Sequence, residues 1–600
     1  MAHLLGCEKV RLEFPTAKIF DDLTIGVNSG DRIGIVGRNG DGKSSLLAVL
    51  SGAYEPDAGN VVCGNNVTVG FLEQHDHISD DETVGHAIVG DRAEYEWAAD
   101  AETRSIIAEL VGDISWDAQM GTLSGGQRRR VDLARVLIGD FDVLMLDEPT
   151  NHLDVGAIHW LAEHLKRRWR PGEGALLVIT HDRWFLDEVC LDMWEVHDRI
   201  ITPFEGGYSA YIQQRVERDR QNAVAAAKRK NILRKELAWL ARQPQARATK
   251  PKFRRDAALE LIADEPPVRK TIELRRSAMS RLGKKVINLK GAGVSFGENE
   301  VLKPIEWNVG AGDRIGILGA NGAGKTTLLR LMCGELAPTK GRVEMGQTVK
   351  LAVLDQQLSQ LREIETDLVR VVISRYKTRY ELDDGREVSP GQLLQELGFE
   401  AAQLNCPVKD LSGGQRRRLQ LCLILLDRPN VLVLDEPGND LDTDMLTQVE
   451  NLLDSWPGTL ILVSHDRYLT ERVTDDQYAI IDGVVRHMPR GVDQYLEELA
   501  ASKAHGAQGV QAAQAQQSAT QGEGLSQKEL RELKKQRSST ERKMGTARSK
   551  LAKAQEELQQ IDGFDYVALG EQQAKIDGLK AELEALEDLW LELEETLSGE

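Results

Sequence analysis

Four short motifs occur twice in this 600-residue chain, in the same order both times. LSGGQRRR occupies Leu123–Arg130 and returns at Leu411–Arg418, 288 positions later. GRNGDGKSS is matched by GANGAGKTT, VLMLDEP by VLVLDEP and THDRWFLDEV by SHDRYLTERV, at offsets of 282, 288 and 284 residues. A near-constant offset across four motifs indicates an internal duplication. We therefore expect two copies of one folding unit.

Each copy alternates short apolar runs with helical stretches, which is typical of an α/β domain. Between the copies, Gln213–Asp256 carries fourteen Lys and Arg against four Asp and Glu, and is rich in helix formers. Near the end, an Ala/Gln/Gly/Ser-rich stretch precedes apolar residues spaced three and four apart on two arms, which predicts an antiparallel coiled-coil hairpin. The expected segments are an α/β domain at 1–212, a basic helical linker at 213–283, a second α/β domain at 284–497, a flexible linker at 498–525 and the hairpin at 526–600.

Composition excludes several classes of protein. No apolar run approaches the roughly 18–20 residues that a membrane-spanning helix needs, and the N-terminal residues turn charged too soon for a signal peptide. We therefore expect a cytoplasmic chain without a membrane domain. The net charge of −20 argues against nucleic-acid binding by the whole molecule, although it permits local basic patches.

The glycine-rich motif of each copy predicts a phosphate-binding loop. Gly37–Ser44 and Gly319–Thr326 both fit GxxxxGK[ST], and each lies between an apolar strand and a helix. Backbone N–H groups and the helix N-terminus would hold ATP phosphates, while the lysine reaches the β- and γ-phosphates and the next hydroxyl binds Mg²⁺. The expected ATP-binding residues are Gly37, Asn39, Gly40, Gly42, Lys43, Ser44 and Ser45, with Gly319, Asn321, Gly322, Gly324, Lys325, Thr326 and Thr327 in the second copy.

Two carboxylates end an apolar strand in each copy. Burying an unpaired charge is costly, so this position indicates a use for both groups. Asp147 and Asp435 would contact Mg²⁺ through water, together with Ser44 of the first copy and its counterpart in the second. Glu148 and Glu436 would polarise the attacking water and are the expected catalytic bases.

Three further pairs of residues recur at matching positions. The pairs are His181 with His465, Gln74 with Gln356, and Phe14 with Phe296. Each histidine follows a β-like run and is expected to act in catalysis through the γ-phosphate. Each glutamine could reach Mg²⁺ or water. Each phenylalanine precedes its loop by 23 residues and could stack on adenine, or could be an ordinary core aromatic.

LSGGQ between a phosphate-binding loop and a DE strand resembles the signature of ABC-type ATPases. In that family the two domains pack head to tail, and the signature of one domain caps the ATP on the other. The resemblance implies that two ATP molecules bind at an interface within this chain. It also implies a capping role for Ser124, Gly125, Gly126 and Gln127, and for Ser412, Gly413, Gly414 and Gln415.

Two such domains on one chain with a basic linker resemble the ABC-F family, and the C-terminal hairpin resembles its Uup-like branch. This likeness implies a translation factor whose partners are ribosomal RNA and tRNA. ATP-driven closure would place the linker at the tRNA exit region of the ribosome. The nucleic-acid contacts implied are Arg242, Arg247, Lys250, Lys252, Arg254 and Arg255.

Two other functions remain open at this point. A Uup-like DNA-associated ATPase could use the basic arm of the hairpin, including Arg531, Lys534 and Lys535, on backbone phosphates. A detached ATPase subunit of a transporter would need a separate membrane partner and would leave the basic linker unexplained. Asp41 in the first loop stands where the second has Ala323, so the two sites differ in charge, but no expected catalytic group is missing from either.

Overall fold

The computed structural model describes most of the two duplicated copies and a small part of the last hundred residues. The described residues are 2–15, 17–74, 76, 78–218, 220–221, 283, 285–297, 299–355, 359–376, 380–381, 387–396, 399, 403–439, 441–502, 536, 539–540, 542–548, 550–551, 575–581, 583, 585 and 590. They fall into two compact units, Met1–Leu499 and Ala500–Glu600. Both copies of the duplication lie in the first unit.

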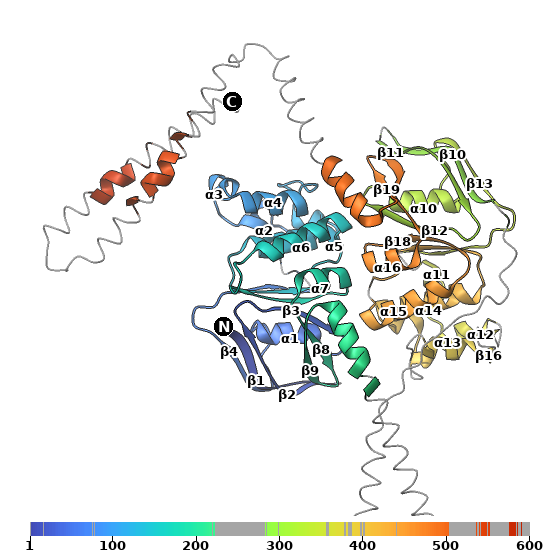
Figure 1. Cartoon of the computed structure of the whole chain (residues 1–600), viewed down its shortest axis with the longest axis horizontal. Helices are drawn as coiled ribbons and strands as arrows, with labels where there is room; N and C mark the ends of the chain where they lie inside the picture. The colour runs from blue at the N-terminus through green and yellow to red at the C-terminus, as the bar shows by residue number, and fades with distance from the viewer. Residues whose placement is uncertain are drawn as a thin grey trace, which may run out of the picture. The chain divides into compact units, whose positions relative to one another are not determined.

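The first copy contains two sheets (Figure 1). An antiparallel sheet has the order β2-β1-β4, and a six-stranded sheet has the order β5-β6-β7-β3-β8-β9, with only the last pair antiparallel. The strands are β1 (His3–Phe14), β2 (Ala17–Asn28), β3 (Arg32–Gly37), β4 (Ala58–Cys63), β5 (Val69–Leu72), β6 (Val143–Asp147), β7 (Ala175–Ile179), β8 (Asp192–His197) and β9 (Ile200–Glu205). The helices are α1 (Lys43–Leu50), α2 (Val84–Val89), α3 (Glu94–Ala99), α4 (Ala101–Leu110), α5 (Gly125–Ile138), α6 (Val155–Arg167) and α7 (Arg183–Val189).

The second copy repeats this arrangement, with sheet orders β11-β10-β13 and β14-β17-β18-β12-β19-β20. Its strands are β10 (Lys285–Phe296), β11 (Asn299–Gly310), β12 (Arg314–Gly319), β13 (Lys340–Met345), β14 (Leu351–Leu354), β17 (Val431–Asp435), β18 (Thr459–Val463), β19 (Asp476–Ile481) and β20 (Val484–His487), with the short pair β15 (Tyr380–Glu381) and β16 (Glu387–Val388). Its helices are α10 (Lys325–Cys333), α11 (Ser359–Arg362), α12 (Val369–Ser374), α13 (Pro390–Glu396), α14 (Gly413–Leu426), α15 (Thr443–Ser455) and α16 (Arg467–Val473). The prediction of two α/β ATPase-like domains in tandem is confirmed.

Both faces of the six-stranded sheet are covered, which explains why its central strands are apolar throughout. In β6, Leu144 and Leu146 pack against a cluster that includes residues of α5 and α6. Val143 and Met145 point to the other face, where they meet residues of α1 and the antiparallel sheet. All five residues of this strand are buried, including Asp147 at its end.

A tight loop follows the central strand of each six-stranded sheet and leads directly into a helix. β3 ends at Gly37 and α1 begins at Lys43, and the second copy matches this with β12 and α10. Gly42, just before α1, has a φ of 96°, and a Cβ there would lie 2.2 Å from Cγ2 of Ile19. Only glycine fits such a position. The loop therefore brings a helix N-terminus to the carboxyl edge of the sheet.

A buried ion-pair cluster joins the two copies. Arg183, the first residue of α7, pairs with Glu450 of α15 and lies 3.1 Å from Asp466, just before α16. The side chains of Arg183 and Glu450 are only 7% and 1% exposed. Tyr468 of α16 also donates to Asp187 of α7 at 2.8 Å. The contact between copies is therefore polar and desolvated at this point.

The second unit is described only in short helical stretches, at 542–548 and 575–581 among others. Ala547 and Ile576, which belong to the two apolar seams of the predicted hairpin, are buried. Most of the hairpin and nearly all of the predicted linkers lie outside the described residues, so the coiled coil and the segment boundaries stay predictions. Across the part of the chain that is described, no helix has the length and apolar character needed to cross a bilayer.

Replacing Arg183 with alanine should destabilise the packing of the two copies. The change leaves Glu450 and Asp466 desolvated without this partner, a loss of about 3 kcal/mol for a buried pair. Arg467, at the matching position of the second copy, pairs with Glu471 and Asp493, whose side chains are 40% and 65% exposed. Arg467→Ala is therefore the control and should cost under about 1 kcal/mol. Denaturant midpoints of the full chain measure both; equal shifts would contradict this account.

Candidate functional site

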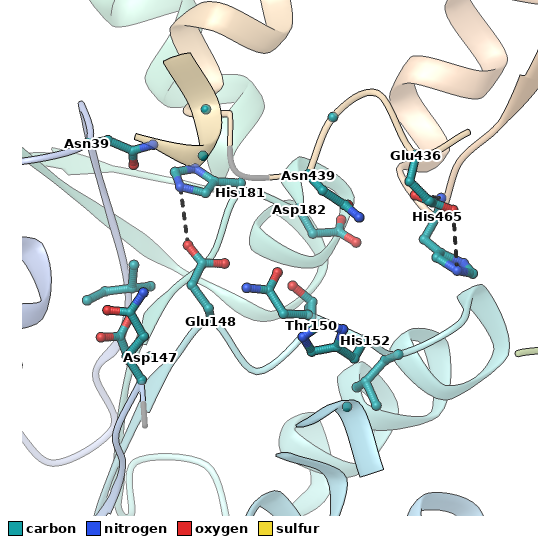
Figure 2. A pocket seen from close by; sticks show the side chains of 18 of the residues that line it. Asn39, Asp147, Glu148, Thr150, His152, His181, Asp182, Glu436, Asn439 and His465 are labelled. Carbon is teal, nitrogen blue, oxygen red and sulfur yellow. Dashed lines mark hydrogen bonds and ion pairs between the residues drawn. The ribbon is translucent and has the colours of Figure 1, made fainter. Parts of the chain in front are cut away.

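A cavity of about 1250 Å³ lies where the two copies meet. It is lined by residues of the first phosphate-binding loop and by the start of α14 from the second copy, Ser412, Gly413 and Gly414. It is also lined by the start of α5 and by Asn321 and Gly322 of the second phosphate-binding loop. Each loop therefore shares a cavity with the LSGGQ segment of the opposite copy, and Figure 2 shows residues of both copies around it.

Contacts across the copies hold each phosphate-binding loop. The backbone N–H of Asn321 donates to Asp154 at 3.1 Å, and its side-chain amide donates to the carbonyl of His152 at 2.8 Å. The backbone N–H of Asn39 lies 3.5 Å from Asp442 in the same manner. Asp154 and Asp442 are the N-caps of α6 and α15. The loop of each copy thus meets the start of a long helix from the other.

The two lysines of the loops are largely buried and held by carbonyl oxygens. Lys43 Nζ donates to the carbonyls of Gly37 and Arg38, each at 2.9 Å. Lys325 Nζ donates to Gly319 at 2.7 Å and lies 3.3 Å from Nε2 of His465. These ammonium groups lie at a helix N-terminus, so two sources of positive potential coincide. The arrangement suits an anion of high charge, such as a triphosphate.

Each strand-end aspartate lies beside the hydroxyl that follows the lysine. Asp147 accepts a hydrogen bond from Ser44, and Asp435 accepts one from Thr326 at 3.2 Å. Burial raises the pKa of both carboxyls above the ordinary value. A hydroxyl and a carboxylate oxygen are ligands that Mg²⁺ accepts, directly or through water. This donor set therefore fits the metal ion predicted from the sequence.

Glu148 and Glu436 occupy the same strained position in both copies. Both have a φ of 51°, which non-glycine residues adopt rarely and often at functional sites. Burial, with a smaller contribution from the neighbouring aspartate, raises the pKa of each carboxyl to about 8. One oxygen of each, Oε2 of Glu148 and Oε1 of Glu436, is buried without a hydrogen-bond partner in the described residues. A carboxyl with this proton affinity can take a proton near neutral pH.

A histidine lies next to each of these glutamates. Nε2 of His181 is 3.3 Å from Glu148, and Nε2 of His465 is 3.4 Å from Glu436, as the dashed lines of Figure 2 show. Burial, with a smaller contribution from the loop lysine, lowers the pKa of each imidazole to about 3. Both histidines are therefore neutral near pH 7. They can donate one hydrogen bond and accept another.

The LSGGQ segments begin helices that carry matching caps. Ser124 accepts from the backbone N–H of Gln127, and the side chain of Gln127 accepts from the backbone N–H of Ser124; Ser412 and Gln415 repeat this capping box. The cap leaves the first N–H groups of α5 and α14 directed out of the helix, where an anion would be stabilised. Gly125 and Gly126 add no side chain that would block such an approach.

Some of the remaining predicted residues line the cavity, and others lie away from it or outside the described residues. Gln74 and Phe14 line the cavity, and Phe14 packs edge-to-face on Tyr54 with ring centroids 5.8 Å apart. Phe296 is 55% exposed at the end of β10 and is absent from the lining. Gln356 and the predicted nucleic-acid contacts lie outside the described residues; these are Arg242, Arg247, Lys250, Lys252, Arg254, Arg255, Arg531, Lys534 and Lys535.

Two pairs of residues at this site were not predicted from the sequence. Asp154 and Asp442 recur at an offset of 288 residues, within NHLD and GNDLD, so the duplication could have identified them. Arg129 donates to the carbonyls of Glu73 and Asp147, and Arg417 donates to the carbonyl of Glu436. Both arginines lie in the RRR run after LSGGQ, and each ties the start of a capped helix to the carboxylate strand of its own copy.

Comparison with known proteins adds a second line of evidence. Residues 20–151 and 302–439 both match the family described as ABC transporter, and residues 194–275 match another family with the same description. The chain is 32% identical to the uncharacterized ABC transporter ATP-binding protein YfmR of Bacillus subtilis (strain 168), over 98% of each chain. It is 33% identical to the energy-dependent translational throttle protein EttA of Mycobacterium tuberculosis (strain H37Rv), over 78% of this chain and 89% of EttA. A solved structure of an RNase-L inhibitor shares the fold, with a TM-score of 0.56 and 20% identity over 82% of this chain and 93% of that one.

The raised pKa of the two glutamates predicts a pH-dependent stability. In the folded protein each carboxyl titrates at about 8, above the ordinary value of 4.5, so folding takes up protons between these values. The stability contributed by the neutral carboxyls is present at low pH and is lost as the pH rises through about 8. A Glu148→Gln, Glu436→Gln variant does not titrate at these positions. The unfolding free energy of this variant should exceed that of the wild type. The difference should grow by an amount on the order of a few kcal/mol between pH 5 and pH 9.

Thermal unfolding of both proteins without nucleotide, across this pH range, measures the difference. A gap that stays constant with pH would show that the two carboxyls titrate at ordinary values in the folded chain.

Proposed function

Because this chain belongs to the ABC-F group of the ABC ATPase family, we propose that it acts on the ribosome as a translation factor. It carries two ATPase domains on one chain and is an ATP hydrolase. The observation that carries this proposal is the similarity to EttA, whose name describes a translational throttle, over 89% of that protein. The basic segment 213–256 between the two domains supports it, because a charge run of this sign suits RNA phosphates.

Each ATP binds on the phosphate-binding loop of one copy and is capped by the LSGGQ segment of the other. Support comes from the shared cavity, whose lining includes Lys43 and Ser44 together with Ser412 and Gly413. The capped N-terminus of α14 offers free N–H groups toward the end of the triphosphate, and α5 does the same for the second site. The nucleotide thus closes the two copies on each other and stabilises their contact.

Glu148 and Glu436 act as the bases that orient water for attack on the γ-phosphate. The high proton affinity of both groups supports this role, because each takes up a proton readily once it is ionised, and Oε2 of Glu148 is buried without a hydrogen-bond partner among the described residues. The neutral imidazoles of His181 and His465 donate a hydrogen bond to the γ-phosphate, since each lies beside its glutamate and is held uncharged. Mg²⁺, held by Ser44 and Asp147 in the first copy and their counterparts in the second, would offset phosphate charge.

Hydrolysis then separates the two copies and releases the ribosome. ATP binding brings the copies together, so the basic linker between them takes a fixed direction only in the closed state. Arg242, Arg247, Lys250, Lys252, Arg254 and Arg255 contact RNA phosphates in that state. Turnover therefore sets how long the protein stays on the ribosome.

Substituting both glutamates should separate binding from hydrolysis. Glu148→Gln with Glu436→Gln removes the bases without changing side-chain volume, so ATP should still bind while turnover falls about 10²- to 10⁴-fold. The trapped closed state should increase co-sedimentation with ribosomes in the presence of ATP. The same variant is incubated with duplex and branched DNA in parallel. ATP-dependent retention on DNA but not on ribosomes would replace the translation role with the DNA-associated one.

Reversing the charge of the linker should weaken binding to ribosomes. Replacing Arg242, Arg247, Lys250 and Arg254 with glutamate removes phosphate contacts, so affinity should fall and its dependence on salt should become shallower by about one unit of slope per lost contact. A matched variant with Lys at the three arginines keeps the charge and should retain most of the salt slope. Binding assays at several salt concentrations measure both. An unchanged slope in the glutamate variant would mean that the linker merely faces solvent.

A further inference from the structure

A helix leaves each copy after its last strand and packs against the other copy. Residues 208–218 are helical after β9, and residues 491–499 are helical after β20. Tyr211 and Tyr495 occupy matching positions in these helices, 284 residues apart, and both are buried. The first helix meets the start of α15, and the second meets the start of α6. The two junctions are therefore related by the duplication.

The first junction is charged. Arg215 forms a two-pronged pair with Asp444 of α15, at 2.7 and 3.0 Å, and its Nε lies 3.2 Å from Glu195 of β8. Glu195 also accepts from the hydroxyl of Tyr211 at 3.1 Å. The side chains of Arg215 and Asp444 are only 11% and 26% exposed, so this pair is poorly screened by solvent.

The second junction is apolar. Leu499 stands where the first copy has Arg215, and Gly156 where the second has Asp444. A Cβ at Gly156 would lie 2.7 Å from Cδ2 of Leu499, so the helix after β20 and the start of α6 are in direct contact. Val155 beside it packs with Tyr495 in one apolar cluster. Because Leu499 and Gly156 are uncharged, these two positions form no ion pair like that of Arg215 with Asp444.

The charged junction contacts the first phosphate-binding loop. Asp444 also lies 3.7 Å from Nε of Arg38, which is part of the first phosphate-binding loop. Two residues earlier, Asp442 caps α15 and lies against the backbone N–H of Asn39 in the same loop. In the second loop the residue that matches Arg38 is Ala320. The start of α15 thus contacts the first loop and the departing helix at once.

We infer that Arg215 is a positioning residue for the first ATP site. Through Asp444 it holds the start of α15 against the first phosphate-binding loop. Nucleotide bound at Lys43 and the helix 208–218 therefore influence each other. In the second copy the start of α6 also contacts its loop and the departing helix, but at Leu499 and Gly156 this contact is apolar and has no ion pair. The coupling is reciprocal, since any effect of Arg215 on ATP affinity equals the effect of ATP on the junction. The inference rests on ATP binding alone and not on the ribosome as partner.

The test measures each ATP site separately in the full-length chain. Lys325→Ala leaves the first site to be titrated with a fluorescent ATP analogue, and Lys43→Ala leaves the second. Adding Arg215→Leu, the residue of the second junction, should weaken binding about five-fold at the first site and less than two-fold at the second. Equal losses at both sites, or none at either, would overturn the inference.

A control arginine lies on the same helix. Arg218 pairs with Glu195 at 2.6 Å and stacks over Phe204, both in the first copy. Arg218→Leu removes the same charge and should change affinity at the first site less than Arg215→Leu does. A matching loss would show that the net charge of the helix, and not the contact with Asp444, is responsible.

A second measurement covers the case in which Arg215→Leu fails to fold. Asp444→Asn keeps the size of the side chain while removing its charge. In the Lys325→Ala background, ATP should slow hydrogen exchange in residues 208–218, and Asp444→Asn should abolish that slowing. In the Lys43→Ala background, ATP should leave exchange in these residues unchanged. Slowing of equal size in both backgrounds would contradict a connection to the first site alone.

Discussion

Each phosphate-binding loop in this chain is completed by the opposite copy. The backbone N–H groups of Asn39 and Asn321 lie against Asp442 and Asp154, which cap helices of the other copy. The LSGGQ segments reach the same cavity from across the interface. Part of the surroundings of each loop therefore comes from the other copy, through contacts between residues 167 and 403 positions apart in sequence. Duplication on one chain raises the effective concentration of the second half and makes the pairing intramolecular.

The same arrangement removes two carboxyl groups from water. Glu148 and Glu436 are buried with a positive φ, and one oxygen of each has no hydrogen-bond partner among the described residues. Each feature has an energetic cost of order 1–3 kcal/mol. The fully buried strands β6 and β17, which end at the adjacent aspartates, fix the backbone against relaxation. The apolar sheet thus stabilises a carboxyl that water would otherwise ionise.

Local motifs allowed the chemical groups of the site to be predicted, because a phosphate-binding loop needs only a few neighbouring residues. Ser124 and Ser412 could be placed across the interface only through the family resemblance, since no spacing in the sequence reports which copy they face. Asp154 and Asp442 were missed because an aspartate before a helix is usually just a cap. Phe296 matches Phe14 in sequence but is exposed, whereas Phe14 packs on Tyr54, whose counterpart is Leu336.

The two copies are alike in their chemistry and unlike in their connections. Lysine, aspartate, glutamate and histidine recur at both sites with nearly equal distances between Glu148 or Glu436 and its histidine. The differences include Arg38 and Asp41 of the first loop, which are Ala320 and Ala323 in the second, and a charged junction that is apolar in the second copy. A change among the expected reacting groups should slow hydrolysis, whereas a change at a junction should alter how a site is coupled to the helix that it contacts. Two sites that share the same chemical groups can therefore differ in the structures that they contact.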